Sequence, residues 1–502
     1  MPSERRLHPL SFLFDLGGQI QQFLVPGLLL IVGAGSAGWD WEAWLMVLLI
    51  PSGSVAVIRS LTFRYRFDPS ELVIRSGLIF RNERHLPYDR IQNIDAVQNI
   101  VHRLLGLVEV RIETGSGAEA EARMSVLPLS ALEEMRDSIS SRRQSIVPVA
   151  AASGVAVPER QSLLRLDPRE LLLAGFIDSR GLVIVGAAFG LLWELGLFDS
   201  AADLVFGGKV SGRGMIRQFV SGLAGRGMPS PGQIALGVAA FGALVVLMRI
   251  MSMGWSLIRL YGFTLERAAE DLSTEFGLFT RVMTTIPLHR IQMLTIRRGP
   301  LHRLFGAASV RVDTAGGDGG GEGAAARESL APIIRDRLLP PLLREALPDI
   351  EVDGVQWRPV DPRAFRRALR GALLFALVSS ALCVVMLKGW TLALLLTLVV
   401  WGVVNTRLYV THLGWAVTER AVLFRSGWIS NTVSVARFTK IQAVTLTASP
   451  FDRRWRMAQV SVDTAGAAGA SHRIDIPYLE YDTARWLHAR LSSEAARTAF
   501  RW

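Results

Sequence analysis

One stretch of this sequence occurs three times with its internal spacing preserved. Each copy has a Gly, then a basic residue 13 positions later that is followed by Ile-Gln, then a Thr 24 positions after the basic residue. These positions are Gly77, Arg90, Gln92 and Thr114; Gly277, Arg290, Gln292 and Thr314; and Gly427, Lys440, Gln442 and Thr464. Self-similarity of this kind is the sequence signature of a duplicated unit. The chain therefore contains three copies of one fold.

Length and composition agree with three units in a membrane protein. A chain of 502 residues corresponds to about three domains of roughly 150 residues each. Half of the residues are hydrophobic, and a mean hydropathy of +0.31 indicates several membrane spans. The net charge of +11 is then more typical of cytoplasmic loops near anionic lipid than of nucleic-acid binding. The single Cys383 cannot form an intrachain disulfide.

Six apolar runs predict six membrane spans in three hairpins. A span needs about 20 helical residues to cross a hydrocarbon core about 30 Å thick, and the runs approach this length at 23–37, 43–58, 181–197, 234–251, 369–387 and 391–404. Arginines flank the outer ends of the first hairpin and are absent from its turn. The positive-inside rule therefore places the N-terminus and the following domain in the cytoplasm. A cleavable signal peptide at 1–37 is disfavoured because a second span follows at once.

Alternating apolar and polar residues follow each hairpin and predict short antiparallel strands, in a sheet or small barrel, with a closing helix. We expect helices at 129–141, with Leu129, Leu132 and Met135 at helical spacing, and at 479–499, with Trp486, Leu487 and Leu491 buried. We expect a linker at 142–160, a flexible hairpin tip at 316–323 and a long external loop at about 198–233. The predicted order is hairpin 1–60, domain 61–145, hairpin 163–258, domain 259–347, hairpin 360–408 and domain 409–502.

Together these features resemble a known family. A transmembrane hairpin, strands joined by Ser-Gly, Arg-Ile-Gln, a turn ending in Leu-Leu-Gly and a strand ending in Thr are similar to the bacterial pleckstrin-homology-like membrane proteins of the second type, among them members with three tandem domains. The resemblance implies an α+β membrane protein with seven-stranded PH-like antiparallel barrels, each capped by a C-terminal helix. It implies a location in the bacterial inner membrane, and six spans with a cytoplasmic N-terminus place the C-terminus of this multi-pass chain in the cytoplasm as well. The third copy departs from the pattern, because Lys440 replaces Arg and residues 451–456 replace the Leu-Leu-Gly turn.

The cations of the repeated motif have two interpretations. Arg90, Arg290 and Lys440 could face phospholipid phosphates or an acidic partner at a barrel rim. Alternatively they pair with a carboxylate or cap a turn, while the Gln side chains satisfy strand-edge backbone groups. We favour the structural role, since a shared fold explains the recurrence as readily as a shared ligand. His102 and His302, without further ligands at metal-binding spacing, are expected to be turn residues.

Other charged residues are predicted to lie at the membrane surface. The arginines that crowd the inner end of the third hairpin are candidate headgroup contacts, each worth on the order of 1 kcal/mol near anionic lipid: Arg363, Arg366, Arg367 and Arg370. Asp178, Arg180 and Glu194 stand near predicted span ends. An interfacial position for them is favoured over an ion path through the bilayer.

The functional expectation is a non-enzymatic platform. The sequence has no nucleophile elbow, HExxH pair, Walker loop or Cys/His cluster, so we expect no catalysis, cofactor or metal. The resemblance implies a role in envelope stress or resistance to membrane-active peptides. Expected partners are membrane lipids and, by resemblance, a smaller single-domain relative, in a homo- or hetero-oligomer without nucleic acid. The alternative is a transporter or lipid-handling protein, which the low polarity of the predicted spans disfavours.

Overall fold

The computed structural model describes residues 62–114, 122–135, 161–178, 231–314, 329–383, 391–464 and 473–497, apart from short gaps at 69, 78–80, 89–90, 133, 269–270 and 353, together with residues 5, 6, 11, 186 and 190. The spans predicted at 23–37 and 43–58, nearly all of that at 181–197, the linker at 142–160, the hairpin tip at 316–323 and most of the external loop lie outside the described residues.

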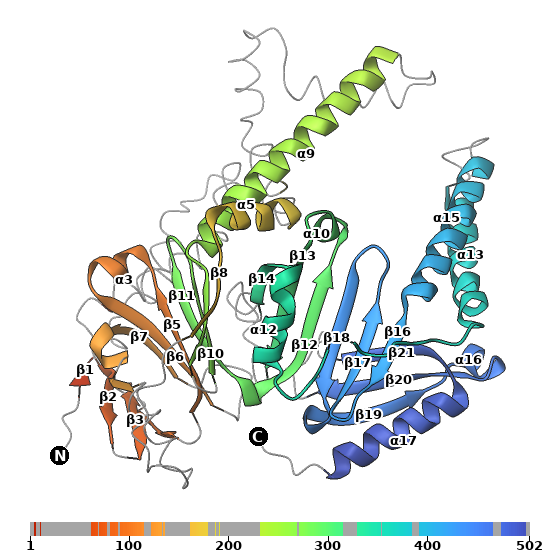
Figure 1. The fold of residues 1–502 in the computed structure, drawn as a ribbon. Helices are drawn as coiled ribbons and strands as arrows, with labels where there is room; N and C mark the ends of the chain where they lie inside the picture. Colours follow the sequence, from red (N-terminus) through yellow and green to blue (C-terminus); the bar gives the residue numbers. More distant parts are fainter. Residues whose placement is uncertain are drawn as a thin grey trace, which may run out of the picture. The chain divides into compact units, whose positions relative to one another are not determined.

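Each repeat supplies a set of four strands followed by a set of three (Figure 1). The first domain contains β1 (Arg5–Arg6), β2 (Arg64–Phe67), β3 (Glu71–Ser76), β4 (Asn82–Pro87), β5 (Ile91–Gln98), β6 (Leu107–Thr114) and β7 (Ala122–Pro128). The second contains β8 (Gln161–Arg165), β9 (Thr264–Ala268), β10 (Asp271–Phe276), β11 (Arg281–Pro287), β12 (Ile291–Arg298), β13 (Ala307–Thr314) and β14 (Ser329–Arg335). The third contains β15 (Arg358–Pro359), β16 (Gly414–Val417), β17 (Ala421–Ser426), β18 (Asn431–Arg437), β19 (Ile441–Thr447), β20 (Met457–Thr464) and β21 (Arg473–Glu480). The predicted antiparallel sheets are therefore confirmed.

The first strand of each domain precedes the hairpin segment in the sequence. β15 pairs with β16, placing Arg358 opposite Trp415, although the third hairpin separates the two strands along the chain. β1 pairs with β2 in the same way across residues 7–63. The segments predicted as hairpins are thus insertions between the first two strands of a domain, and do not simply precede it. Strands of only two residues give no hydropathy signal, which is why the sequence pattern did not reveal this.

The sheets continue from one domain into the next, so the domains are not separate barrels. Strand order is β7-β6-β5-β11-β10-β9-β8 in one seven-stranded sheet and β14-β13-β12-β18-β17-β16-β15 in the other. The joints are the antiparallel pairs β5–β11 and β12–β18, which lie side by side in Figure 1. Each joint aligns a strand of one domain's second set with a strand of the next domain's first set. The two remaining sheets are β1-β2-β3-β4 and β19-β20-β21.

The first and third domains each have a core formed by residues from both of their strand sets. In the first domain the core includes Leu72, Ile112, Leu132 and Met135, and Met283 of β11 packs against it. In the third domain it includes Met293 of β12 together with Leu487 and Leu491 of α17 (Tyr481–Arg497). Helix α12 (Leu339–Ala346) has a buried apolar face in the second domain. Each joint therefore also contributes a methionine from the neighbouring domain to a core.

Two residues predicted to be buried on the closing helices are exposed. Trp486 is 46% exposed, and Ala484 fills the buried position on α17 instead. The indole ring of Trp486 lies on the outer side of α17, and the guanidinium of Arg358 is 5.9 Å from the ring centroid. Leu129 is also exposed. A helix of period 3.6 cannot bury Trp486 and Leu487 equally, because adjacent residues diverge by about 100° around the axis.

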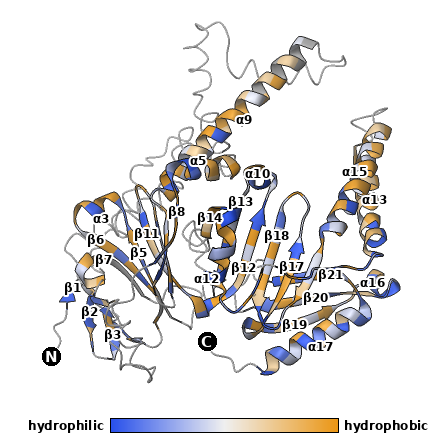
Figure 2. Ribbon diagram, viewed as in Figure 1, coloured by the Kyte–Doolittle hydropathy of each residue, from blue (hydrophilic) through white to orange (hydrophobic). Residues whose placement is uncertain are grey.

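Among the described helices, two are long and apolar enough to cross a membrane, within α9 (Pro231–Leu260) and at α15 (Thr391–His412), and not the six that were predicted. Both are largely hydrophobic in Figure 2. α13 (Ala364–Leu382) packs beside α15, and Ala372 lies close enough that a Cβ on Gly402 would be 3.2 Å from its side chain. Three arginines near its beginning set α13 apart from the two spans: Arg366, Arg367 and Arg370.

α5 (Pro168–Ile177) and α9 form a compact pair of their own. Asp167 caps α5 through a capping box with Glu170, and Pro168 occupies the first turn, where its fixed φ suits a helix start. Hydroxyl groups of α9 donate hydrogen bonds to carbonyl groups near both ends of α5: Ser256 Oγ donates to Leu171 O at 3.0 Å and Ser252 Oγ donates to Asp178 O at 2.9 Å. Asp178 is exposed at the end of α5, and Arg180 and Glu194 lie outside the described residues.

Candidate membrane-contact site

A short helix joins the first two strands of the second set in every domain. These helices are α3 (Ile100–Leu104), α10 (Pro300–Leu304) and α16 (Pro450–Arg454), here called the turn helices. Each starts after an extended residue and closes with a left-handed residue, Gly106, Gly306 or Arg456. In the third copy Ser449 Oγ accepts a hydrogen bond from the backbone N–H of Asp452, which caps α16.

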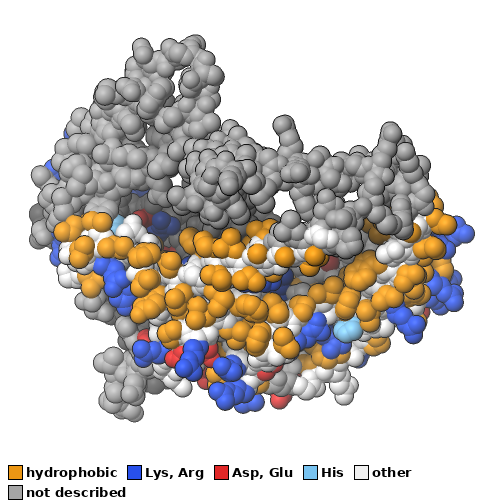
Figure 3. Space-filling view, turned by 90° about the horizontal axis from the view of Figure 1, so that it is seen from above, with side chains coloured by type: hydrophobic (Ala, Val, Ile, Leu, Met, Phe, Trp, Pro, Cys, Tyr) orange, Lys and Arg blue, Asp and Glu red, His pale blue; other side chains and the backbone are white. Residues whose placement is uncertain are grey.

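The turn helices expose large apolar side chains beside basic ones. Leu104 is 81% exposed, Leu304 is 74% exposed and Phe451 is 63% exposed. The neighbouring Ile100, Val101, Leu105 and Phe305 are also exposed. The same element thus exposes apolar side chains in all three domains. Arginines lie next to them, at Arg103, Arg303, Arg453 and Arg454. This combination is typical of a segment that lies at a membrane interface. In Figure 3, hydrophobic side chains form a broad band across the described residues, with Lys and Arg side chains mainly along its border.

Contacts with α13 fix the position of α16. Arg367 Nε donates to Asp452 Oδ1 at 2.9 Å, and its guanidinium lies 5.4 Å from the ring centroid of Phe451. Arg370 sits 4.9 Å from the ring centroid of Trp455. Burial opposes ionisation of Asp452, but hydrogen bonds from Ser449 and the Arg367 contact outweigh it and lower the pKa of this carboxyl group. α16 is therefore tied to the part of α13 at which its uninterrupted apolar run begins.

The four arginines predicted as headgroup contacts do not all have the same surroundings. Arg363, Arg366 and Arg370 are exposed, whereas Arg367 is half-buried between α13 and α16. Arg363 precedes α13, and its backbone N–H donates to Asp361 Oδ1 at 2.7 Å. Three of the four guanidinium groups can therefore reach solvent or lipid phosphates, while Arg367 has a positioning role.

The repeated Arg-Ile-Gln motif lies in the interior in the second copy. Arg290 is 7% exposed and Gln292 is buried, with its Nε2 donating to Arg290 O at 3.3 Å. Such burial favours the structural role in this copy, which stays a prediction. Thr464 is buried, Thr314 is half-buried and Gln442 is exposed. Arg90 and the side chains of Gln92 and Thr114 lie outside the described residues.

Lys440 meets the second domain at the joint between β12 and β18. Burial lowers the pKa of Lys440, and the positive charges of Arg437 and Arg290 lower it further. Arg437 Nη1 donates to Leu288 O at 3.1 Å, which ties the end of β18 to the second domain. The structure thus brings the motif cations of the second and third copies near each other, an arrangement that the repeat spacing did not reveal.

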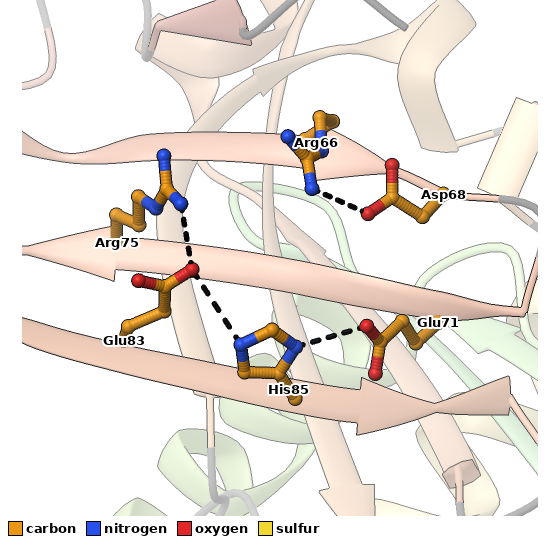
Figure 4. Close-up of polar contacts among 6 residues, drawn as sticks. All are labelled: Arg66, Asp68, Glu71, Arg75, Glu83 and His85. Carbon is orange, nitrogen blue, oxygen red and sulfur yellow. Dashed lines mark hydrogen bonds and ion pairs between the residues drawn. The ribbon is translucent and has the colours of Figure 1, made fainter. Parts of the chain in front are cut away.

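A second charged cluster lies on β2, β3 and β4 (Figure 4). Arg75 pairs with Glu83 at 2.8 Å, and His85 contacts Glu71 at 2.9 Å and Glu83 at 3.5 Å. The hydrogen bond to Glu71 is the largest influence on His85 and raises its pKa. These groups neutralise one another on an exposed strand face. Within the described residues, no group of three or more His, Cys, Asp and Glu is placed to hold a metal ion.

The histidines predicted as turn residues do lie in the turn helices. His302 Nδ1 accepts a hydrogen bond from the backbone N–H of Gly299 at 3.4 Å, which caps α10. His102 is buried at the corresponding position of α3. The apolar exposure of the turn helices was missed, although the sequence carried a signal. Leu104-Leu105 and Leu304-Phe305 follow arginines in a segment too short to bury both.

A membrane protein built from tandem PH-like domains is the class that this fold and site define. The bacterial PH domain family matches residues 20–143, 230–340 and 372–495, and the chain belongs to that family. It is also similar to the UPF0699 transmembrane protein YdbT of Bacillus subtilis strain 168, with 23% identity over 492 residues, covering 93% of this chain and 94% of that protein. No solved structure matches.

Proposed function

We propose that this chain is a non-enzymatic protein of the bacterial inner membrane whose turn helices hold its PH-like domains against the cytoplasmic lipid surface. The observation that carries the proposal is the attachment of α16 to α13 through Arg367 and Asp452, with Phe451 left exposed. Because α13 pairs with the candidate span α15, α16 is held close to the level of the headgroups. A multi-pass chain with both termini cytoplasmic is the topology that we propose.

Two physical effects support contact between the turn helices and lipid. Moving an exposed Leu or Phe side chain out of water contributes up to about 2 kcal/mol. Each exposed arginine near anionic headgroups adds about 1 kcal/mol. One turn helix is therefore a weak anchor, but three in one chain act together, since the hairpins already hold them near the membrane. The resulting surface would leave the remaining faces of the domains available to cytoplasmic partners.

Labelling at Leu304 tests the proposal. A Leu304→Cys variant in a Cys383→Ser background, labelled with an environment-sensitive fluorophore, is reconstituted in nanodiscs of mixed anionic and zwitterionic lipid. We expect quenching by a lipid-attached quencher and protection from a water-soluble one. Asn82→Cys, on the exposed strand β4, is the matched control and should show the opposite pattern. Equal accessibility of both labels to the water-soluble quencher would contradict lipid contact.

The biological role that we propose, by resemblance, is envelope stress or resistance to membrane-active peptides. The turn helices allow this role to be tested. Leu304→Asp should abolish the lipid contact of α10 and leave the core packing unchanged, because Leu304 is exposed. If lipid contact serves resistance, cells carrying Leu304→Asp in place of the native chain should survive a cationic peptide less well than cells with the native chain. Survival equal to that of the native chain would separate resistance from lipid contact. Substrate flux in proteoliposomes would favour the transporter alternative.

A further inference from the structure

The joint between neighbouring domains is built twice in the same register. Gln98 of β5 stands opposite Arg281 of β11, and Arg298 of β12 stands opposite Asn431 of β18. Offsets of 200 and 150 residues relate the copies, so these two pairs occupy equivalent positions. The first strand of the second set, β5 in the first domain and β12 in the second, thus pairs in both cases with a strand of the next domain.

β19 is the third strand of this kind, and it ends its sheet. The described part of the chain places β20 on one side of β19 and no strand on the other. Gln442, Ala443, Thr445 and Thr447 are exposed along it, whereas the first four residues of β12 are all buried. An open edge presents backbone N–H and C=O groups that a further strand can pair with.

The composition of β19 suits such pairing. Its sequence from Ile441 to Thr447 has no charge and no Pro, and contains Thr, Val, Ile and Leu, which favour strands. The sheet-ending strand β4, which is equivalent to the joint strands β11 and β18, differs: Glu83, Arg84 and His85 are consecutive there, and Pro87 follows. Charges and proline on an edge are the usual protection against unwanted pairing. β4 is thus a protected edge and β19 an unprotected one.

We infer that β19 pairs antiparallel with β19 of a second copy of this chain, about a two-fold axis at Thr445. In this register Leu446 of each copy stands opposite Val444 of the other. Both side chains pack against the core of the third domain, so the two cores would continue across the axis. The contact joins two three-stranded sheets into one of six strands, and a two-fold contact closes on itself, so that neither copy keeps an unpaired β19 edge.

The charges on β4 argue against β4 of a second copy as the occupant. In the register of the existing joints, Glu83 would take the place of Met283 and Val433, opposite Leu446. Met283 packs against the core of the first domain at that position. A carboxylate there would face an apolar core without a partner, which is costly. Pairing of β19 with itself brings no charged side chain into the joint.

Charge pairs at position 445 test this arrangement, because residue 445 would face its own copy across the axis. The full chain is purified in detergent as Thr445→Lys and as Thr445→Glu, and the mass of each, and of their mixture, is measured by light scattering. We expect a dimer for the native chain, monomers for each variant alone, and a dimer when the two variants are mixed. Recovery on mixing also shows that the variants are folded. The control is Asn82→Lys on β4, which should remain dimeric.

Other outcomes overturn the inference. If β4 were the occupant, residue 445 would face Arg84, so Thr445→Glu alone would associate more strongly while Thr445→Lys alone dissociated. Pairing with a different protein would leave the native chain monomeric after purification. A dimer that persists in both single variants would place the contact elsewhere in the chain. Lipid contact by the turn helices is measured separately at Leu304, so either proposal can fail alone.

Discussion

At the scale of single residues, three glycines decide whether the duplicated turn can form. Gly77, Gly277 and Gly427 have positive φ angles of 97°, 117° and 83°, a conformation that glycine adopts readily and other residues rarely. At Gly427 space is also missing, because an added Cβ would lie 2.2 Å from Ser430 O. The repeated glycine that first revealed the three copies is therefore a backbone requirement of the turn after β3, β10 and β17.

Substitution of Gly427 should destabilise the third domain. We expect Gly427→Ala to lower the free energy of unfolding by at least about 2 kcal/mol, from the strained φ and the clash together, as read from thermal unfolding in detergent. Ser426→Ala, one residue earlier at the end of β17, is the control and should change little. An unchanged melting temperature for Gly427→Ala would mean that the turn has another conformation in solution.

At the scale of elements, α5 and α9 meet at a glycine that permits close approach. A Cβ added to Gly175 would lie 2.6 Å from Met253 Cα and 2.7 Å from Ser252 O. Gly175→Ala should therefore push the helices apart and weaken the hydrogen bond from Ser256 to Leu171, at a cost of about 1–3 kcal/mol. Gly254→Ala on α9 meets nothing within 4 Å and should be stabilising by helix propensity, by up to about 1 kcal/mol. Melting of the two variants in detergent should shift in opposite directions; equal shifts would contradict the packing.

The strands and the closing helices could be predicted from the sequence because their signals are local. Alternation marked β3, β6 and β20, and helical spacing identified Leu487 and Leu491 as core residues. The joints could not be predicted in this way, since β5 and β11 are far apart in the chain and each reads as an ordinary strand. The exposure of Leu104 and Leu304 could not be predicted for the same reason. A local pattern gives the periodicity of an element, but the exposure of a side chain depends on which distant segments pack against it.

At the scale of the whole molecule, the hairpin segments are built into the domains. In the third domain α13 and α15 leave from β15 and return to β16, two paired neighbours in one sheet. Both ends of the hairpin are thus fixed in the same sheet. A flexible linker inserted at one end would free that end, but the other end would still be attached to the sheet. The contact of α16 with α13 adds a third connection, made by side chains, between the hairpin and the second strand set.

The pair Arg367–Asp452 should consequently couple the hairpin to the third domain. In a double-mutant cycle with Arg367→Met and Asp452→Asn, measured by unfolding in detergent, we expect a coupling of about 1 kcal/mol, since the pair is half-buried and well aligned. Because the folded pKa of Asp452 is lowered, this stabilisation is fully present above its unfolded pKa of about 3.9 and is lost as pH falls through the lower folded value. Arg366→Met, at an exposed arginine of the same helix, controls for charge. A coupling near zero at neutral pH would show that α16 is held by Phe451 and Trp455 alone, and the level of α16 would then depend on the aromatic contacts with α13.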